Sequence, residues 1–369
     1  MGAAARGDHR EARDDDVVAT WESASGNARP PLIVLAPLQE FLRSEGLLEG
    51  EISVAPVGEG HSNVTYLIRS EGRALVLRRP PRPPLPPSAH DVVREAKLLR
   101  ALSASPVRIP KVLSICESDA VIGSPFYLMD WIEGEVIGSS VPVALDDVEQ
   151  RRLISVQLID ALAEIHSVDA RAAALQAFGK PHGYLQRQLR RFSGLWELNR
   201  TRELQPIITV RDWLQDHLPR QEEATIVHGD FRLGNTIFAA ESPPRLLAVL
   251  DWEMATIGDP LADIGYLCMM WSERDDPHLG LREQVAKVTR AEGFLSRAQL
   301  VARYEQVTGR SIADLRWYET LALWKMAIFM EGNYRRAVAG STDDPYLRSF
   351  DQGVVELAQA AERTAFRRC

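Results

Sequence analysis

Three residues in the middle of the chain have side chains suited to binding a divalent cation and accepting a proton. Asp230 and Asn235 follow an apolar run at residues 225–227, and Asp251 follows a second apolar run at residues 246–250. Strands that end in polar clusters often build active sites. Two carboxylates and an amide oxygen are hard ligands of the kind that Mg²⁺ takes, with water and phosphate completing its shell. The pattern predicts a magnesium and phosphate site at two strand ends.

The offset between Asp230 and Asn235 matches the catalytic loop of protein kinases, where the aspartate accepts the substrate proton and the asparagine binds Mg²⁺. The phrases HGDFRLGN, at 228–235, and LDWE, at 250–253, resemble motifs of the aminoglycoside phosphotransferase and choline kinase family. Within that family, DFRLGN and DWEMATIGDP are most similar to kinase-like domains associated with acyl-CoA dehydrogenases. The resemblance implies that Asp230 is the catalytic base and that Asn235 and Asp251 bind Mg²⁺.

Other residues near these motifs are expected to support the loop. HGD or LDWE alone would more often be an ordinary turn or strand end, but their offsets and the GDP tripeptide at 258–260 favour the kinase interpretation. His228 is expected to hydrogen-bond to the loop backbone. Glu253 is a supporting residue, Asp259 is expected to brace the loop rather than bind a second metal, and Asp263 is expected to cap a helix or support the loop.

The resemblance implies an α+β, bilobal, protein kinase-like fold. A small N-terminal lobe would contain a five-stranded antiparallel sheet plus a helix, and a larger C-terminal lobe would be mainly helical. Residues 1–29 lack a sustained apolar period and are expected to be a disordered tail. Residues 30–131 would form the nucleotide-covering lobe, and residues 132–369 would carry the catalytic loop and the acceptor site.

Strands are expected at about residues 52–57, 63–69, 74–79, 112–116 and 125–131. Gly58, Gly60 and Ser62 lie in the first turn, where glycines allow the backbone to approach a phosphate and the serine adds a donor. Most such turns merely connect strands. Met129 and Trp131 lie in a segment that resembles the family's inter-lobe hinge, where backbone groups would bind adenine without distinguishing ATP from GTP.

The third strand departs from the family pattern. Its period-2 alternation places Val76 and Arg78 on one face, so that Val76 would cover the adenine while Arg78 would reach the phosphates. A lysine is usual at the second position, and arginine is not an equivalent replacement at a packed site. Glu95, in a helix expected to begin with a capping box at Ser88, matches the carboxylate that pairs with this cation in kinases.

The loop between them, PPRPPLPP at 80–87, is expected to be a stiff connection, although its PxxP spacings leave docking of a proline-binding domain open.

The C-terminal part carries helical apolar periods, at about residues 148–168, 184–200, 260–271, 296–308, 312–336 and 346–367. His166 ends the first of these and is interpreted as a core residue. Arg187, Arg190 and Arg191 form a basic cluster in the second. They are candidate acceptor-site residues for an anionic substrate, with a solvated helix face as the alternative.

Composition excludes several classes of protein. The 369 residues are 45% hydrophobic and 25% charged, with formal net charge −8, which argues against nucleic acid as the principal partner. No apolar run has the ~18 residues of a membrane span, and the first residues lack a signal-peptide core, so a cytoplasmic location is expected. Cys116, Cys268 and Cys369 show neither disulfide nor zinc spacing.

These observations predict an enzyme that uses ATP and Mg²⁺ to phosphorylate a hydroxyl group of a small molecule. The resemblance to acyl-CoA dehydrogenase-associated domains favours a hydroxyacyl metabolite or its CoA thioester as acceptor. An aminoglycoside O-phosphotransferase is the second hypothesis, and a nucleotide-binding pseudokinase with a regulatory role is the third. A protein acceptor is disfavoured because no activation-loop segment separates Asp251 from the GDP tripeptide. The sequence does not define the oligomeric state.

Overall fold

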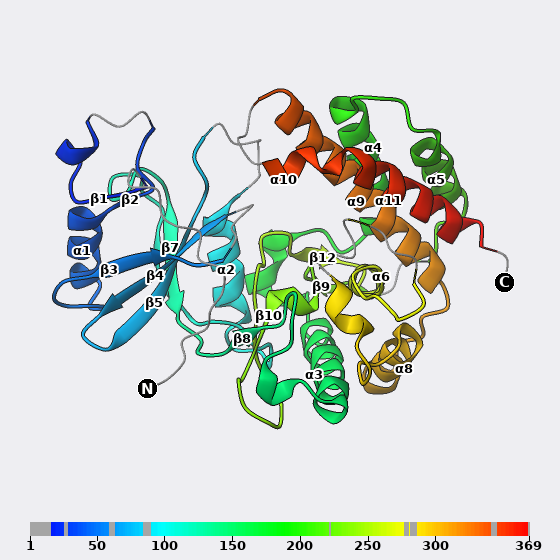
Figure 1. Cartoon of the computed structure of the whole chain (residues 1–369), viewed down its shortest axis with the longest axis horizontal. Helices are drawn as coiled ribbons and strands as arrows, with labels where there is room; N and C mark the ends of the chain where they lie inside the picture. The colour runs from blue at the N-terminus through cyan, green and yellow to red at the C-terminus, as the bar shows by residue number, and fades with distance from the viewer. Residues whose placement is uncertain are drawn as a thin grey trace. The chain divides into compact units, whose positions relative to one another are not determined.

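A computed structural model describes residues 16–25, 29–58, 63–83, 90–220, 223–276, 280, 286–340 and 345–367, with 345 and 346 described by backbone only. The chain forms two compact units, one up to Gly134 and one from Glu135 onward. The first contains a five-stranded sheet and the second is mainly helical (Figure 1), which confirms the predicted α+β fold class. None of the described helices is both long and apolar enough to cross a membrane.

The sheet of the first unit is antiparallel throughout, with strand order β3-β4-β5-β7-β6. Its strands are β3 (Ser53–Pro56), β4 (Val64–Ser70), β5 (Arg73–Arg79), β6 (Val112–Cys116) and β7 (Phe126–Asp130). Helix α1 (Leu35–Ser44) packs with Leu75 and Leu77 of β5 in one hydrophobic core. Because side chains alternate along a strand, Val76 and Arg78 lie on the opposite face, the side of helix α2 (Val92–Leu102).

Residues 16–25 are ordered, which corrects the prediction of a disordered tail over residues 1–29. Strand β1 (Val17–Val18) pairs in parallel with β2 (Ile33–Val34), and the Asp16 carbonyl accepts hydrogen bonds from the Leu32 and Ile33 amides. This pairing satisfies backbone hydrogen-bonding groups of the two valines in β1, and their side chains cover buried residues. The composition of the segment does not reveal this stabilisation. Residues 1–15 and 26–28 of the predicted tail lie outside the described residues.

Helix α2 begins later than the sequence suggested. Asp91 is its N-cap, and the Asp91 carboxylate accepts a hydrogen bond of 2.9 Å from the Arg94 amide. Aspartate is as good an N-cap as serine, so the sequence offered two possible first residues for this helix, Ser88 and Asp91. Ser88 itself, and residues 84–87 of the proline-rich loop, lie outside the described part of the chain.

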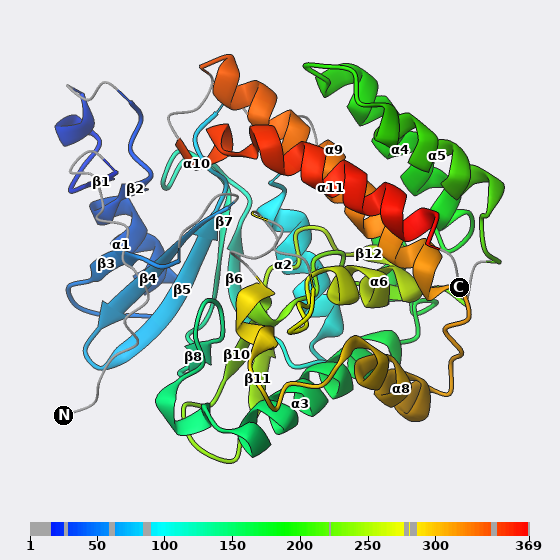
Figure 2. The ribbon, with the colours of Figure 1, turned by 45° about the vertical axis from the view of Figure 1, so that its right-hand side comes forward.

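The second unit is organised around the long helix α9, which packs against helices α4, α5, α6 and α11 (Figure 2). Its helices are α3 (Val148–His166), α4 (Tyr184–Asn199), α5 (Gln205–Asp216), α6 (Leu261–Met269), α8 (Arg297–Thr308), α9 (Leu315–Val338), α10 (Pro345–Arg348) and α11 (Phe350–Ala365). Short strands form two small sheets, from β8 (Glu135–Val136), β10 (Thr236–Phe238) and β11 (Leu246–Val249), and from β9 (Thr225–Val227) and β12 (Thr256–Gly258).

Helix α5 was absent from the sequence prediction. It begins with Pro206 in its first turn, a position that tolerates proline because the missing amide needs no intrahelical partner. The predicted helix at about residues 346–367 is two helices, α10 and α11.

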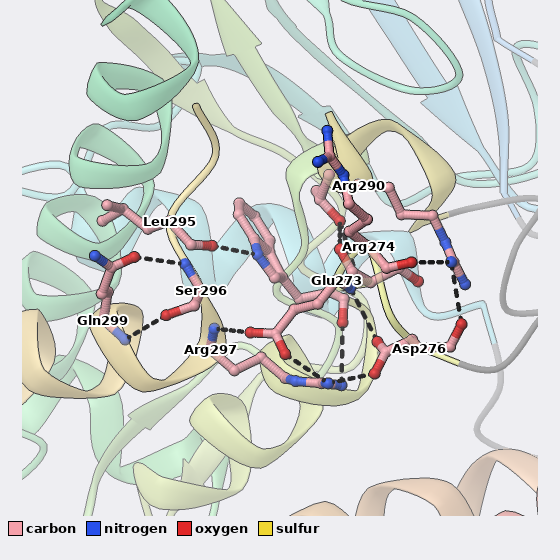
Figure 3. Close-up of polar contacts among 11 residues, drawn as sticks. Glu273, Arg274, Asp276, Arg290, Leu295, Ser296, Arg297 and Gln299 are labelled. Atoms are coloured by element: carbon pink, nitrogen blue, oxygen red, sulfur yellow. Dashed lines mark hydrogen bonds and ion pairs between the residues drawn. The ribbon is translucent and has the colours of Figure 1, made fainter. Parts of the chain in front are cut away.

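The segment that follows α6 is tied to the start of α8 (Figure 3). The Arg297 guanidinium donates to carboxylate oxygens of Glu273, at 3.0 Å, and Asp276, at 2.5 Å. The Trp271 indole donates to the Leu295 carbonyl at 2.8 Å. Charge-assisted hydrogen bonds of this kind are stronger than neutral ones, so they hold the C-terminal end of α6 in place.

Candidate active site

The predicted catalytic loop lies between β9 and β10 in the second unit. Gly229 has φ of 85°, and a Cβ atom there would lie 2.9 Å from the Met254 carbonyl oxygen. Only glycine combines this backbone conformation with so close an approach. The turn then places Asp230, which is half-buried, and Asn235, which is buried.

Both carboxylate oxygens of Asp230 are held by hydrogen bonds. The Asn235 Nδ2 group donates to Asp230 Oδ2 at 2.8 Å, and the Tyr266 hydroxyl donates to Asp230 Oδ1. Arg232 lies 3.7 Å from the same Oδ1 atom. Because its two oxygens have fixed donors, the carboxylate has a defined orientation before any substrate binds.

Asn235 lies beside the strand end that carries Asp251. Thr236 pairs with Val249 across β10 and β11, and the Leu250 amide donates to the Asn235 carbonyl at 2.8 Å. The Asn235 Nδ2 group also donates to the Asp230 carbonyl at 2.9 Å. Since the amide nitrogen is committed to Asp230, the Oδ1 atom is the part of the side chain left to accept a ligand.

Asp251 has a left-handed backbone conformation, with φ of 66°. Such a conformation is uncommon outside glycine, although aspartate tolerates it better than most residues. The neighbouring bonds fix it, because the Leu250 carbonyl interacts with His228 Nε2 at 3.0 Å and the Trp252 indole donates to the Val249 carbonyl at 2.9 Å. Strained residues held in this way cluster at functional sites.

His228 hydrogen-bonds to the loop backbone, as expected, and it also connects the loop to the strand end before Asp251. It is fully buried, its Nε2 atom contacts the Leu250 carbonyl, and its Nδ1 atom accepts a hydrogen bond of 3.2 Å from the Asp230 amide. The histidine therefore spans the two strand ends that carry the predicted base and the predicted metal ligand.

A buried carboxylate supports the loop from behind. Asp263, in the first turn of α6, accepts hydrogen bonds from the His228 amide at 2.7 Å and the Gly229 amide at 2.8 Å. His166 Nε2 lies 3.1 Å from Asp263 Oδ2, and His166 Nδ1 lies 2.7 Å from the Tyr304 hydroxyl. His166 is buried, as predicted, but it is part of a polar network rather than an apolar core.

Burial alone would raise the pKa of the Asp263 carboxyl group. The hydrogen bond with His166, electrostatic interactions with His166 and then His228, and the hydrogen bond from the Gly229 amide outweigh that effect and lower the pKa below its usual 3.8. Asp263 therefore stays ionised at neutral pH and keeps its contacts to the loop amides.

Tyr266 is a site residue that the sequence analysis missed. It lies three residues after Asp263 on α6, so both side chains emerge on the same face of the helix, toward the loop. Burial, and then the charge of Asp230, raise the pKa of the Tyr266 phenol well above 10. The phenol stays protonated and acts as a donor to Asp230. The D-x-x-Y spacing on a helix after the GDP tripeptide was the available signal.

Asp259 and Glu253, the other two supporting residues predicted in this unit, differ in burial. Asp259 is fully buried and accepts from the Leu261 amide and the Tyr318 hydroxyl, each at 3.0 Å. Glu253 is half-buried in the turn between β11 and β12. These two hydrogen bonds connect Asp259 to the start of α6 and to α9.

The three arginines of the candidate acceptor cluster differ in their surroundings. The Arg187 guanidinium donates to the His182 carbonyl and, at 2.6 Å, to the Lys180 carbonyl. Arg187 and Arg190 line a pocket of about 580 Å³ between α4 and α5. Arg191 lies over the Phe192 ring, with its Cζ atom 6.0 Å from the ring centroid.

In the first unit, Arg78 and Glu95 form an ion pair with 3.0 Å between Nε and Oε2, and Glu95 is buried. Val76 and Met129 are buried on paired positions of β5 and β7, and Trp131 is half-buried just after β7. Gly58 has φ of 78°, whereas Gly60 and Ser62 lie outside the described residues.

Comparison with known proteins agrees with this geometry. Residues 53–296 match the model of the phosphotransferase enzyme family. The chain is 36% identical over 344 residues to acyl-CoA dehydrogenase family member 10 of Mus musculus, covering 91% of this chain and 32% of that protein. It is 31% identical over 313 residues to acyl-CoA dehydrogenase family member 11 of Gallus gallus, covering 84% of this chain and 40% of that protein. The chain thus spans about a third to two fifths of these relatives.

Solved structures show the same fold. A Ralstonia eutropha protein assigned to the aminoglycoside phosphotransferases superposes with a TM-score of 0.76 at 30% identity, covering 89% of this chain and 97% of that one. Aminoglycoside phosphotransferase APH(4)-Ia, in a ternary complex with AMP-PNP and hygromycin B, has a TM-score of 0.57 at 17% identity, with coverages of 90% and 100%. Family and fold support phosphoryl transfer of the kinase type, and the chain belongs to the phosphotransferase enzyme family.

Proposed function

We propose that the protein transfers the γ-phosphoryl group of ATP to a hydroxyl group of a small molecule, a hydroxyacyl metabolite or its CoA thioester. The observation that carries this proposal is the orientation of the Asp230 carboxylate by hydrogen bonds from Asn235 and Tyr266. The amide of the preceding residue, Gly229, is itself held by Asp263. The second unit would perform the chemistry and bind the acceptor, and the first would bind the nucleotide.

Asp230 acts as the base in this proposal. The acceptor oxygen bonds to the γ-phosphorus while the bond from that phosphorus to the bridging oxygen of ADP breaks. The hydroxyl proton passes to the Asp230 carboxylate, which also orients the acceptor. Phosphoryl transfer demands mainly positioning and charge stabilisation, so a carboxylate with both oxygens fixed suits the task.

Asn235 and Asp251 would hold Mg²⁺. Asn235 contributes an amide oxygen and Asp251 a carboxylate, from adjacent positions at the ends of β10 and β11. In the part of the chain that the structure describes, no group of three or more His, Cys, Asp or Glu side chains could hold a metal by itself. A two-residue site fits Mg²⁺, which usually keeps water and substrate phosphate in its shell. The bound ion would neutralise charge on the phosphates.

The nucleotide would contact the first unit. Arg78 would bind its phosphates, the turn from Gly58 through Gly60 and Ser62 would cover them, and Val76, Met129 and Trp131 would surround the adenine. Two solved relatives of the fold support a nucleotide site of this kind, APH(4)-Ia with AMP-PNP and aminoglycoside 2'-phosphotransferase-IIIa with GDP. ATP is the proposed phosphoryl donor, and GTP is the alternative donor.

Removing the charge of Glu95 is expected to weaken nucleotide binding. In Glu95→Gln, Arg78 loses the carboxylate that fixes its Nε atom at 3.0 Å. A hydrogen bond to a charged group contributes ~1.5 kcal/mol or more, so the Kd for ATP should rise about tenfold. Isothermal titration calorimetry measures this, with Glu117→Gln as the control because Glu117 forms an exposed pair with Lys97. An unchanged Kd in Glu95→Gln would contradict the phosphate-binding role of Arg78.

Loss of the Tyr266 hydroxyl is expected to slow the reaction without changing ATP binding. Tyr266→Phe frees one carboxylate oxygen of Asp230, at a cost of ~1.4 kcal/mol to the oriented state, or about tenfold in kcat. Steady-state kinetics on a working acceptor would show the effect in kcat. Tyr334→Phe is the matched control, because its ring packs under Arg202 away from Asp230. Equal kcat values for Tyr266→Phe and wild type would show that the hydroxyl does not orient the base.

The hydroxyacyl class rests on the relatives. Two of them carry the name acyl-CoA dehydrogenase and are longer than this chain, so a kinase-like region shares a polypeptide with acyl-CoA chemistry there. The second candidate, an aminoglycoside, is supported by the Ralstonia eutropha structure at 30% identity. A fold alone does not select an acceptor, because one fold serves many substrates.

A panel of acceptors tests the proposal. Purified protein is incubated with ATP and Mg²⁺ and one compound at a time, chosen from hydroxy acids, hydroxyacyl-CoA thioesters and aminoglycosides, and ADP formation is followed. The proposal predicts turnover on an acyl compound. Turnover on aminoglycosides alone would replace it with the second candidate, and nucleotide binding without turnover on any compound would favour a pseudokinase.

A further inference from the structure

Helices α4 and α9 pack side by side (Figures 1 and 2). Phe192 of α4 contacts Trp324 of α9, with 6.4 Å between ring centroids, and two turns later Asn199 approaches Gly332. This register places Lys325 of α9 beside Phe192, with the Lys325 Nζ atom 4.8 Å from the ring centroid.

Two cations share this one aromatic ring. Arg191 lies over Phe192 at 6.0 Å, and Lys325 lies over it at 4.8 Å. Across the described residues, neither cation forms an ion pair or a hydrogen bond with a carboxylate. The attraction between a ring face and a cation contributes ~1 kcal/mol. This does not compensate for the free-energy cost of partly burying the ammonium group and placing it beside a guanidinium group of the same charge.

Both the burial of Lys325 and the nearby Arg191 act against its protonation. Burial, and then repulsion from Arg191, lower the pKa of Lys325 to about 8, although the Asp263 carboxylate opposes the change. Lys325 is therefore still mostly protonated at neutral pH, in a place where an additional negative charge would be favourable.

The position of the pair relates it to the catalytic loop. Asp263 is close enough to influence Lys325, and its oxygens accept from the His228 and Gly229 amides, next to Asp230. On α4, Tyr184 lies two turns before Arg191 on the same face, and a Cβ atom at Gly258 would lie 2.5 Å from its ring. Lys325 thus lies near the carboxylate that supports the loop, and Arg191 lies on the same face of α4 as Tyr184, which packs at Gly258.

We propose that Lys325 and Arg191 form an anion-binding site that holds a carboxylate or phosphate group of the acceptor. The proposal rests on the proposed function and narrows it, because it requires an anionic acceptor and disfavours polycationic aminoglycosides. It also divides the predicted arginine cluster, since Arg191 takes part while Arg187 is bound to backbone carbonyls. Lys325 is the residue that the sequence analysis did not single out.

Direct titration of Lys325 tests the site without requiring catalysis. The protein is labelled with ¹³C at lysine Cε, and Lys325→Met identifies the Lys325 signal by its absence. The probes are 3-hydroxybutyrate, which offers a carboxylate, coenzyme A, which offers phosphates, and methyl 3-hydroxybutyrate, which is neutral. An anion at the site should raise the titration midpoint of Lys325 above about 8, whereas the neutral ester should leave it unchanged.

The probes also separate the two sources of negative charge. A shift with 3-hydroxybutyrate assigns the site to the acceptor carboxylate, and a shift with coenzyme A assigns it to a phosphate. If neither anion moves the midpoint at millimolar concentration, the site does not exist. Arg191→Gln should raise the midpoint before any probe is added and reduce the response to the anion, because it removes both the repulsion and half of the site.

Kinetics provide the second test. On an anionic acceptor that the enzyme turns over, Lys325→Met should raise KM about ten- to a hundredfold, as expected for loss of a charge-assisted hydrogen bond. Lys97→Met, on an exposed pair with Glu117, is the control. An unchanged KM in Lys325→Met overturns the anion site while the kinase function stands. A shift in the titration without turnover on any acceptor overturns the kinase function while the anion site stands.

Discussion

Asp230→Asn is expected to reduce kcat about 100- to 10,000-fold while ATP binds as tightly as before. The substitution preserves the shape of the side chain but removes the group that accepts the proton, and general base catalysis typically contributes a factor of this size. Asparagine also replaces one acceptor oxygen with a donor NH₂ group, so it no longer accepts from Asn235 Nδ2 and the Tyr266 hydroxyl through two separate oxygens. Single-turnover kinetics and calorimetry with ATP would separate chemistry from binding.

Asp212→Asn is the matched control for this experiment. Asp212 lies on α5 and pairs with its neighbour Arg211 at the surface, so its substitution should leave kcat unchanged. If Asp230→Asn retained more than about a tenth of wild-type kcat, another group would have to accept the proton, because ~1.4 kcal/mol is too small an effect for loss of the base.

Asp263→Asn is expected to destabilise the second unit by about 3 kcal/mol or more. The carboxylate accepts hydrogen bonds from two buried backbone amides and lies 3.1 Å from His166 Nε2. The NH₂ group of asparagine at this position would face N–H donors instead of accepting from them. Each hydrogen bond to a charged group that is lost costs ~1.5–3 kcal/mol. Urea denaturation measures the loss. Asp169→Asn, at an exposed pair with Arg171, should show no measurable change.

The same variant should have a different dependence on pH. Because the pKa of Asp263 is lower in the folded protein than its usual 3.8, the unfolded chain takes up a proton first as the pH falls. The stabilisation by this carboxylate is therefore complete above about pH 5 and is lost as the pH falls through its folded pKa. The stability difference between wild type and Asp263→Asn should shrink progressively as the pH falls below about 5. A difference that stays constant would contradict the ionised state of Asp263.

The motifs in the sequence led to the site because their chemistry depends on short spacings. Asp230 and Asn235 lie five residues apart on one loop, so a local pattern predicts their contact. The apolar runs before His228 and Asp251 predict two strand ends, which the His228 to Leu250 contact joins. The alternation in β5 also placed Val76 and Arg78 correctly on one face of the sheet.

The residues that the sequence analysis missed act over long separations. Tyr304 reaches His166 across 138 positions, and Lys325 meets Phe192 only because α4 and α9 pack in a particular register. No local pattern distinguishes a buried histidine in a polar network from one in an apolar core. Residues 16–25 looked too polar for ordered structure, yet the short strand β1 gains stability from pairing with β2, which the composition of a segment does not encode.

The three arginines that the sequence grouped as one candidate acceptor site have different surroundings in the structure. Arg187, Arg190 and Arg191 were grouped because they are neighbours on one helix. In the structure, Arg187 and Arg190 line a pocket between α4 and α5, whereas Arg191 shares the Phe192 ring with Lys325. Arg187 and Arg191 are one helical turn apart on one face, so their spacing alone does not separate them, and the packing of α4 against α5 and α9 decides which contacts each guanidinium group makes.

Transfer of labelled phosphate from [γ-³²P]ATP to a hydroxyacyl-CoA thioester, in the presence of Mg²⁺, would show whether the protein is a hydroxyacyl kinase with Asp230 as its base. We expect label to appear in a phosphate monoester of the acceptor with wild-type protein and to be lost with Asp230→Asn. Label found only in inorganic phosphate, only in aminoglycosides, or equally in the acceptor with Asp230→Asn would contradict it.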